Sequence, residues 1–416
     1  MKKVLVLAAL ALASTITYAG GYRVSLQGNK ALAMGHTGVA VVNSSESVFF
    51  NPAALVYLED KFSISVGAHG VFSNIAYQDT STGANARTDS PVGTPLYLYA
   101  SYQATDWLAL GLGVYTPYGS AVEYEDDWAG SHLINNIDLQ AIYVQPTVSF
   151  KLNDKISFGG GPIYVTGSVN FNRNLNRTLT DLDGNRANVT IDASGVSSWG
   201  WVASTMVNIT DNLHIGATYR SEIILEAEDG TAEFENIPNS PLTPFENTNI
   251  NASLPLPAEM TVGMSYDFCE KWTFAFDLNR TFWDVYNSLD IDFENPAIPD
   301  SKNARNYKNS SIYRFGMQYE ATKMFTLRTG FYFDESPVRE GYFAPETPRN
   351  DSNNFTAGLT VNLGEHLQID ASFLYSHFKE VDASYNYYFE NGQAVPFKGT
   401  YKTNAFVPGL GLTYKL

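Results

Sequence analysis

The amino-acid sequence predicts an all-β fold, a transmembrane antiparallel β-barrel of 14 strands with an amino-terminal hatch that plugs its lumen. Three observations carry this prediction. The chain begins with an export signal, it is rich in aromatic residues without a long apolar stretch, and its strand-like segments are joined by short and long connections in strict alternation.

Residues 1–19 have the layout of a secretory signal peptide. Lys2 and Lys3 give a charged start, residues 4–13 are apolar, and Thr17-Tyr18-Ala19 offers a small-residue cleavage site. The apolar run is shorter than the ~20 residues that a membrane-spanning helix needs. We therefore expect an exported protein.

The composition favours a membrane barrel. The chain has 26 Tyr, 25 Phe and 6 Trp, 14% of all residues, yet its mean hydropathy is only −0.16. This combination is typical of outer-membrane barrels. The single cysteine, Cys269, excludes an intramolecular disulfide. Loss of the signal peptide lowers the formal net charge from −17 to −19, which argues against nucleic acid as a partner.

Residues 20–58, the predicted hatch, do not follow the strand pattern of residues 59–416, the predicted barrel. Gly35 and Gly38 interrupt this segment, and Asn51-Pro52-Ala53 lies within an apolar run. Irregular backbone cannot face lipid, but it can lie inside a barrel. We therefore expect the hatch to fold into the lumen, with Pro52 in a buried turn where no amide needs a partner. A disordered periplasmic tail is the alternative, but it would be less apolar.

Fourteen segments alternate between apolar and other residues, as tilted membrane strands do. They lie near 61–72, 93–104, 107–116, 139–152, 155–170, 194–208, 212–227, 256–268, 271–284, 309–320, 323–334, 353–363, 366–379 and 401–416. Six connections are tight and seven are long, and the two kinds alternate. This rhythm is typical of an up-and-down barrel with short periplasmic turns and long outer loops.

The last strand presents its apolar residues on one face, from Phe406 to Leu416. Outer-membrane barrels usually close with an aromatic strand of this kind, although most end in Phe rather than Leu. We expect this strand to be the contact for the barrel-assembly machinery. The rhythm of connections places both chain ends on the periplasmic side.

The mature chain resembles the FadL family of outer-membrane transporters, which includes long-chain fatty-acid channels and TodX-type channels for monoaromatic hydrocarbons. The segment "GGYRVSLQGNKALAMGHTGVAVVNSSESVFFNPAAL" is similar to the family's hatch. The later segments "YGSAVEYEDDWAGSH", "SSWGWVAS", "ATYRSEI", "LPLPAEMTVGMSY" and "LRTGFYFDESPV" follow in the family's order.

The resemblance implies a monomeric outer-membrane channel of a Gram-negative bacterium, without cofactor or metal, for passive uptake of a hydrophobic compound. In the family, the ligand moves from an outer groove to a pocket in the barrel and leaves sideways into membrane lipid. A kink in the third strand opens the wall, and Thr116, Pro117, Tyr118 and Gly119 align with it. Pro117 cannot donate to the strand ladder and Gly119 tolerates a bend. The alternative is that Pro117 only begins an outer loop.

Alternation predicts cations in the lumen. Outward apolar neighbours would turn Arg220, Arg314 and Arg328 inward, and Lys308 lies within one position of a basic residue that the family places near the ligand headgroup. Such cations can bind a fatty-acid carboxylate. They can equally pair with inward acids such as Asp370, a purely structural role.

The fourth long loop carries Leu242, Phe245 and Ile250, which could form one wall of the outer groove. The third long loop, which supplies the other wall in the family, is short and polar here. This difference leaves the groove and the fatty-acid ligand open. The Asp181-Leu182-Asp183-Gly184 segment of that loop is interpreted as a turn, since the further ligands of a calcium loop are missing.

Three other functions compete with the uptake of fatty acids. A monoaromatic hydrocarbon channel fits the same resemblance. A barrel phospholipase would carry a His-x-Ser pair, which none of the six histidines forms, so we expect no enzyme. A structural or adhesive barrel would leave the hatch unexplained.

Overall fold

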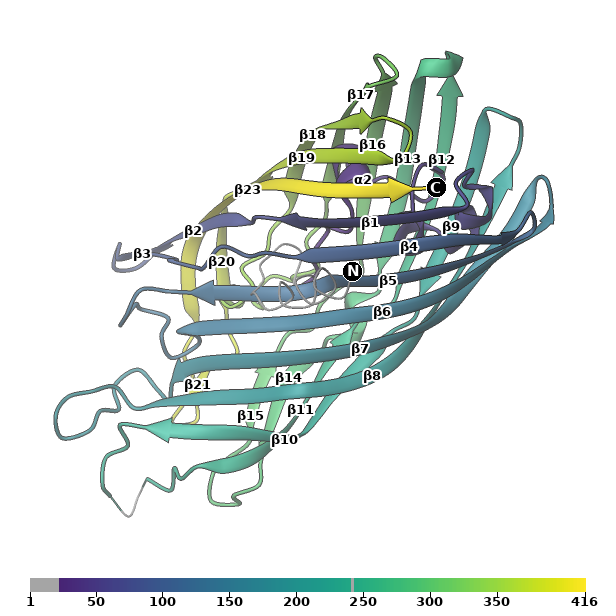
Figure 1. Cartoon of the computed structure of the whole chain (residues 1–416). Coiled ribbons are helices and arrows are strands. Elements are labelled where there is room, and N and C mark those ends of the chain that lie inside the picture. Colours follow the sequence, from purple (N-terminus) through teal and green to yellow (C-terminus); the bar gives the residue numbers. More distant parts are fainter. Residues whose placement is uncertain (1–21, 241–242) are drawn as a thin grey trace.

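The computed structural model describes residues 22–240 and 243–416. In this part of the chain, fourteen antiparallel strands close into a barrel around a plug of short helices (Figure 1). The predicted all-β barrel with a luminal plug is therefore confirmed. The predicted signal peptide, residues 1–19, and Leu242 of the predicted outer groove lie outside the described residues.

Ten strands of the barrel are single elements: β4 (Leu96–Thr105), β5 (Leu108–Glu123), β6 (Asn136–Asn153), β7 (Ile156–Asn174), β8 (Asn188–Asn208), β16 (Ser310–Glu320), β17 (Phe325–Asp334), β18 (Ser352–Leu363), β19 (Leu367–Phe378) and β23 (Phe397–Lys415). Four are divided once: β1 (Phe62–His69) with β2 (Phe72–Asp79), β9 (Leu213–Arg220) with β10 (Ile223–Glu235), β11 (Thr248–Leu256) with β12 (Glu259–Phe268), and β13 (Trp272–Thr281) with β14 (Ser288–Phe293).

Short elements complete the chain. Five small strands lie in the long connections: β3 (Asn85–Arg87), β15 (Ser301–Ala304), β20 (Val381–Tyr385), β21 (Phe389–Glu390) and β22 (Gln393–Ala394). The helices are α2 (Asn29–Ala33), α3 (Ser47–Phe50) and the 3-10 turns η1 (Pro52–Tyr57), η2 (Cys269–Lys271) and η3 (Trp283–Val285).

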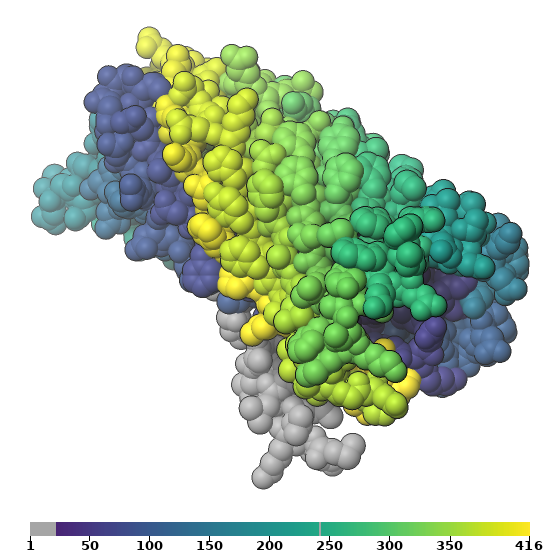
Figure 2. Space-filling view, turned by 90° about the horizontal axis from the view of Figure 1, so that it is seen from above, coloured from purple at the N-terminus to yellow at the C-terminus, as the bar shows by residue number. Residues whose placement is uncertain are grey.

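The barrel closes where the two ends of the chain meet. β1 pairs with β23 in a register that sets Val66 opposite Leu412, and the amide of Phe62 donates to the carbonyl of Leu416 at 3.1 Å. In Figure 2 the yellow carboxy-terminal strand lies directly beside the purple and blue amino-terminal strands. The first and last barrel strands therefore form one continuous wall.

Side chains alternate between the outer face and the lumen, as the sequence pattern predicts. On β16, Tyr313 and Phe315 are 38% and 51% exposed, whereas Arg314 between them is 4% exposed. An exposed apolar face suits contact with lipid hydrocarbon, which offers a side chain no hydrogen bonds. The described residues contain no helix that is both long and apolar enough to cross a membrane.

The hatch helices fill the lumen. α2 packs against β17, β18 and β19, and η1 packs against β5 to β8. Gly35 has a φ of +67°, and a Cβ there would lie 2.4 Å from a backbone oxygen of β16. At Gly38 a Cβ would lie 2.5 Å from the ring of Phe50. Both glycines therefore allow a close approach that a side chain would block.

Every predicted strand has a counterpart, but several extend further outward than the sequence indicates. The third strand was predicted to end at 116, and β5 continues to Glu123. Its outer part contains Pro117 and Gly119, which are typical of loops. It is held as a strand by partners distant in sequence.

Candidate ligand path and wall opening

The third barrel strand, β5, leaves its neighbour halfway along. It pairs with β4 from Leu108 to Tyr115, which lies opposite Tyr97. Its register with β6 shifts between Tyr115 and Tyr118, so that β5 holds one more residue than β6 there. Such a bulge bends the strand and exchanges the faces of all later side chains.

The outer half of β5 pairs with the start of the hatch. Arg23 and Tyr118 form an antiparallel bridge. The amide of Val24 donates to the carbonyl of Pro117 at 2.7 Å, and the amide of Gly119 donates to the carbonyl of Tyr22 at 2.7 Å. Beyond Tyr115, the start of the hatch therefore takes the place of β4 as a pairing partner of β5.

Beside this segment lies a small apolar cavity of about 80 Å³ in the outer half of the lumen. Its walls are aliphatic residues of β6, β7, β8, β10 and β11, together with Tyr22 of the hatch and Ser120 of β5. The cavity thus extends to the point where the hatch meets the kinked strand.

Tyr22 separates the cavity from the kink. Its ring centroid lies 5.9 Å from that of Tyr118, 5.1 Å from that of Trp283 and 5.4 Å from that of Tyr286. Its hydroxyl donates to the carbonyl of Pro255 on β11. Because the buried ring of Tyr22 packs against three other aromatic rings and its hydroxyl is hydrogen-bonded, Tyr22 is a fixed barrier between the cavity and the kink.

The cavity offers no free positive charge. No Lys, Arg or His lines it among the residues that the structure describes. Its one charged lining residue, Glu346, forms a buried ion pair with Arg305, which also donates to the hydroxyl of Tyr385 at 3.1 Å. Because Arg305 neutralises the only charged residue of the described lining, the cavity suits an uncharged ligand.

A smaller polar pocket lies on the other side of the hatch start, next to Pro117. Its Arg23 is 3.7 Å from a carboxylate oxygen of Glu259 and 3.4 Å from one of Asp334. Asn279 and Thr281 each accept from the same guanidinium at 2.9 Å. Arg23 is therefore bound through both terminal nitrogens of its guanidinium to the barrel wall opposite β5.

Two of the predicted luminal cations, Arg220 and Arg314, line this polar pocket. Arg220 donates to the carbonyl of Phe49 at 3.1 Å and lies 4.5 Å from its ring centroid. Nε of Arg314 has no hydrogen-bond partner within residues 22–240 and 243–416. Arg328 does not line this pocket. It lines a separate open pocket at the periplasmic end of the lumen and donates to Gln318 at 2.8 Å.

The prediction of Lys308 as a luminal cation is wrong in this structure. Lys308 is exposed and lines neither the apolar cavity nor the polar pocket. Its neighbour Tyr307 is 1% exposed and occupies the inward position. Lys308 lies between β15 and β16, outside any strand, so the alternation of strand residues does not turn it inward.

Of the predicted outer-groove residues, the structure describes Ile250, which is buried, and Phe245, which is half-buried. Ile250 is fully buried in a cluster with Val189, Ile191 and Ile291. The ring of Phe245 lies 5.5 Å from that of Phe234. Ile250 therefore presents no surface to an arriving ligand, and a capture groove at this place stays a prediction.

The Asn51-Pro52-Ala53 turn fastens the hatch to the wall. The amide nitrogen of the Asn51 side chain donates to the carbonyls of Val39 at 2.6 Å and Thr205 at 3.1 Å. The backbone amide of Ala53 donates to the hydroxyl of Ser204 at 2.9 Å. Pro52 has no amide that could compete in this crowded turn.

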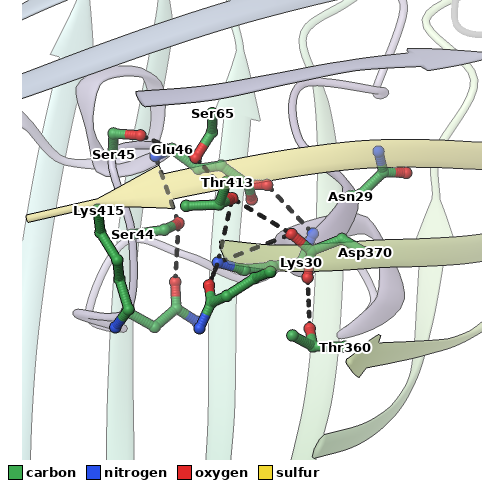
Figure 3. Close-up of polar contacts among 12 residues, drawn as sticks. Asn29, Lys30, Ser44, Ser45, Glu46, Ser65, Thr360, Asp370, Thr413 and Lys415 are labelled. Atoms are coloured by element: carbon green, nitrogen blue, oxygen red, sulfur yellow. Dashed lines mark hydrogen bonds and ion pairs between the residues drawn. The ribbon is translucent and has the colours of Figure 1, made fainter. Parts of the chain in front are cut away.

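A second fastening lies at the periplasmic end, on the opposite side of the hatch. Lys30 of α2 lies 3.7 Å from Asp370 of β19 and donates to Gln368 at 2.6 Å (Figure 3). Glu46 accepts from the backbone amides of Lys30 and Ala31 at 3.2 and 3.1 Å, so it holds the start of α2. Purple atoms of the hatch are visible in the hollow at one end of the barrel (Figure 2).

Sequence reasoning missed Tyr22, Arg23, Ser120 and the Arg305–Glu346 pair. Arg23 carried a usable signal, since it is a lone cation near the start of an apolar segment. Ser120 carried none, because the bulge that turns it inward is invisible in a period-two pattern.

A plugged barrel with an apolar cavity beside an interrupted wall defines a transporter of hydrophobic compounds in the outer membrane. The family described as "Outer membrane protein transport protein (OMPP1/FadL/TodX)" matches residues 10–416, so the chain belongs to this family. The resemblance predicted from the sequence is therefore confirmed.

Relatives and solved structures agree with this assignment. The chain is 28% identical to an outer membrane protein of Neisseria meningitidis serogroup B, with 100% of this chain and 98% of the relative covered. It is 24% identical to the long-chain fatty acid transport protein of Escherichia coli O6:H1, with 96% and 97% covered.

Among solved structures, a FadL homologue of Pseudomonas aeruginosa has a TM-score of 0.80 at 18% identity, with 95% of this chain and 100% of that chain covered. The toluene transporter TodX of Pseudomonas putida has a TM-score of 0.74 at 18% identity, with 96% and 98% covered. These likenesses show a shared fold. The protein is thus an outer-membrane barrel of the Gram-negative type, as predicted.

Proposed function

We propose that this protein is a passive channel that takes up hydrophobic small molecules, either monoaromatic hydrocarbons or long-chain fatty acids and similar compounds, and releases them sideways through the barrel wall beside β5. One observation carries the proposal. The outer half of β5 pairs with Tyr22, Arg23 and Val24 of the hatch, directly beside the apolar cavity. We expect it to act as a monomer whose last strand engages the barrel-assembly machinery.

Lateral release follows from the chemistry of the cargo. An apolar molecule loses about 0.8 kcal/mol for each CH₂ that enters water, so an aqueous exit into the periplasm opposes transport. An exit into lipid avoids this cost. It requires only that the first hatch residues separate from β5, because β4 does not pair with β5 beyond Tyr115.

The cavity lining favours an uncharged ligand, in line with a monoaromatic hydrocarbon channel. The solved toluene transporters of similar fold support this reading. A long-chain carboxylate is the second candidate. It is favoured by Arg314, whose Nε has no partner in the described part of the chain and which lies in the adjoining polar pocket.

The test is a reversible lock between the hatch and the kinked strand. Arg23→Cys with Tyr118→Cys, in a Cys269→Ser background, places two thiols on directly opposed residues of an antiparallel bridge, within reach of a disulfide. Uptake of labelled oleate and toluene is measured in cells without their own channel. We expect oxidation to lower uptake at least about tenfold and a reductant to restore it.

The matched control is Tyr97→Cys with Tyr115→Cys, which joins β4 and β5 where they already pair. Its oxidation is expected to leave uptake unchanged. Equal uptake by the oxidised and reduced forms of the Arg23–Tyr118 variant, with the disulfide verified by mass spectrometry, would rule out release at this place.

A further inference from the structure

Among the described residues that line the apolar cavity, Ser120 is the one whose polar group lacks both a protein partner and contact with solvent. It is fully buried, and its hydroxyl oxygen has no hydrogen-bond partner in residues 22–240 and 243–416. Buried hydroxyls are normally paired, because an unpaired one loses its hydration without compensation. Ser120 is therefore an exception that calls for a partner inside the cavity.

The other polar groups of the lining are already satisfied. Tyr22 donates to Pro255, and the hydroxyl of Thr347 lies 3.1 Å from that of Tyr307. Glu346 is paired with Arg305. Ser168 and Ser253 also line the cavity, but both are partly or well exposed, so water can hydrate them.

The bulge of β5 aims Ser120 at the cavity. Before the bulge, the even-numbered residues Leu110 and Leu112 are 43% and 41% exposed on the outer face. One extra residue between Tyr115 and Tyr118 exchanges the faces, so the even-numbered residue Ser120 points inward. The irregularity that interrupts the wall thus also places a hydroxyl in an otherwise apolar lining.

We propose that Ser120 recognises an uncharged hydrogen-bonding group, a hydroxyl or carbonyl, on a ligand that is otherwise hydrophobic. This inference rests on the proposed function, since it assumes that the cavity holds the cargo. A ligand carboxylate is excluded from this position because the cavity has no unpaired cation among its described lining residues and Glu346 would repel it. The ligand class is therefore a hydrophobic alcohol, phenol or ketone.

The test compares three probes that share one toluene skeleton: toluene, p-cresol and p-toluate. Equilibrium dialysis measures their binding to the full-length protein in lipid nanodiscs, with empty nanodiscs as the blank. We expect wild-type protein to bind p-cresol about tenfold more tightly than toluene, and p-toluate most weakly. Ser120→Ala should weaken p-cresol binding about tenfold and leave toluene binding within about twofold.

Two further variants make the comparison specific. Ser120→Thr keeps a hydroxyl and is expected to retain most of the preference for p-cresol. Ser376→Ala removes a hydroxyl on β19 that donates to Asn354 at 2.6 Å, away from the cavity, and is expected to change nothing.

The outcomes separate the two proposals. Equal binding of p-cresol and toluene to wild type, an equal loss of both in Ser120→Ala, or tightest binding of p-toluate overturns the role of Ser120 but not the channel. No binding of any probe above the blank overturns both the role of Ser120 and the assignment of this cavity to the cargo.

Discussion

The backbone amide of Val24 donates to the carbonyl of Pro117 at 2.7 Å, joining the start of the hatch to the kinked third strand. Pro117 has no amide of its own and so offers the ladder only an acceptor. The next hatch residue toward the amino terminus, Arg23, bonds the opposite wall through Asn279 and Thr281. The start of the hatch therefore contacts β5 on one side and the opposite barrel wall on the other. A movement of the hatch changes its pairing with β5.

The rest of the hatch is anchored independently, and Asn51 is the centre of one anchor. Asn51→Ala removes the bonds that its side chain donates to the carbonyls of Val39 and Thr205. We expect a local loss of about 1–3 kcal/mol. Hydrogen exchange of residues 38–57 should accelerate, whereas exchange of the barrel strands should not. Asn43→Ala, at a half-buried position, serves as the control, and equal exchange in both variants would contradict the anchor.

The Lys30–Asp370 pair forms the other anchor, and both side chains are almost fully buried. Removing one partner leaves an isolated buried charge, so Lys30→Gln or Asp370→Asn alone should cost about 3–5 kcal/mol. The double variant leaves neither member of the pair as an isolated charge and should recover most of that loss. Urea midpoints in detergent measure the cycle. Additive losses would show that the two residues do not act as a pair.

Alternation explains how much of the site could be predicted. Tyr313 and Phe315 on the lipid side fix Arg314 inside, and the same pattern turned Arg220 and Arg328 inward. The partners of these cations could not be predicted. Arg220, for instance, donates to Phe49, a hatch residue far away in sequence whose position depends on tertiary packing.

The errors have different sources. Lys308 was predicted from its nearness to a basic position of the family, and it lies outside β16, which begins at Ser310. The bulge in β5 exchanges the faces of the strand beyond Tyr115, where a period-two pattern no longer holds. Because of this one inserted residue, a prediction based on alternation places Ser120 on the wrong face of β5.

We expect His132 to make the packing at the outer mouth sensitive to pH. Its ring centroid lies 4.6 Å from that of Tyr388 and 5.7 Å from that of Phe397. Burial, reinforced by the positive charge of Arg177, lowers the pKa of His132 to about 4. Because the folded pKa lies below the unfolded value of about 6.5, the packing is at full strength above pH 6.5 and weakens as the pH falls toward 4.

We therefore expect residues 386–397 to exchange amide hydrogens faster at pH 5 than at pH 7.5, after correction for the intrinsic pH dependence. The maximum effect is about 3 kcal/mol, from a pKa difference of two to three units. His132→Phe keeps the ring contacts but cannot titrate, so its corrected exchange should not depend on pH. An unchanged dependence in that variant would assign the effect to another group.

Pro117 provides the most direct test of the wall opening. Pro117→Thr restores a backbone amide that can pair along this edge of β5, which favours a closed wall. We expect uptake of a labelled hydrophobic probe to fall several-fold, about 1 kcal/mol in the opening barrier, which is the typical contribution of one backbone hydrogen bond. Pro408→Thr makes the same exchange in β23, where Pro408 faces outward opposite Phe373, and should leave uptake unaltered. Both variants add one backbone amide and one hydroxyl. A difference in uptake between them therefore reports the position of the changed residue and not the kind of change. Wild-type rates in Pro117→Thr would mean that the missing donor does not control release.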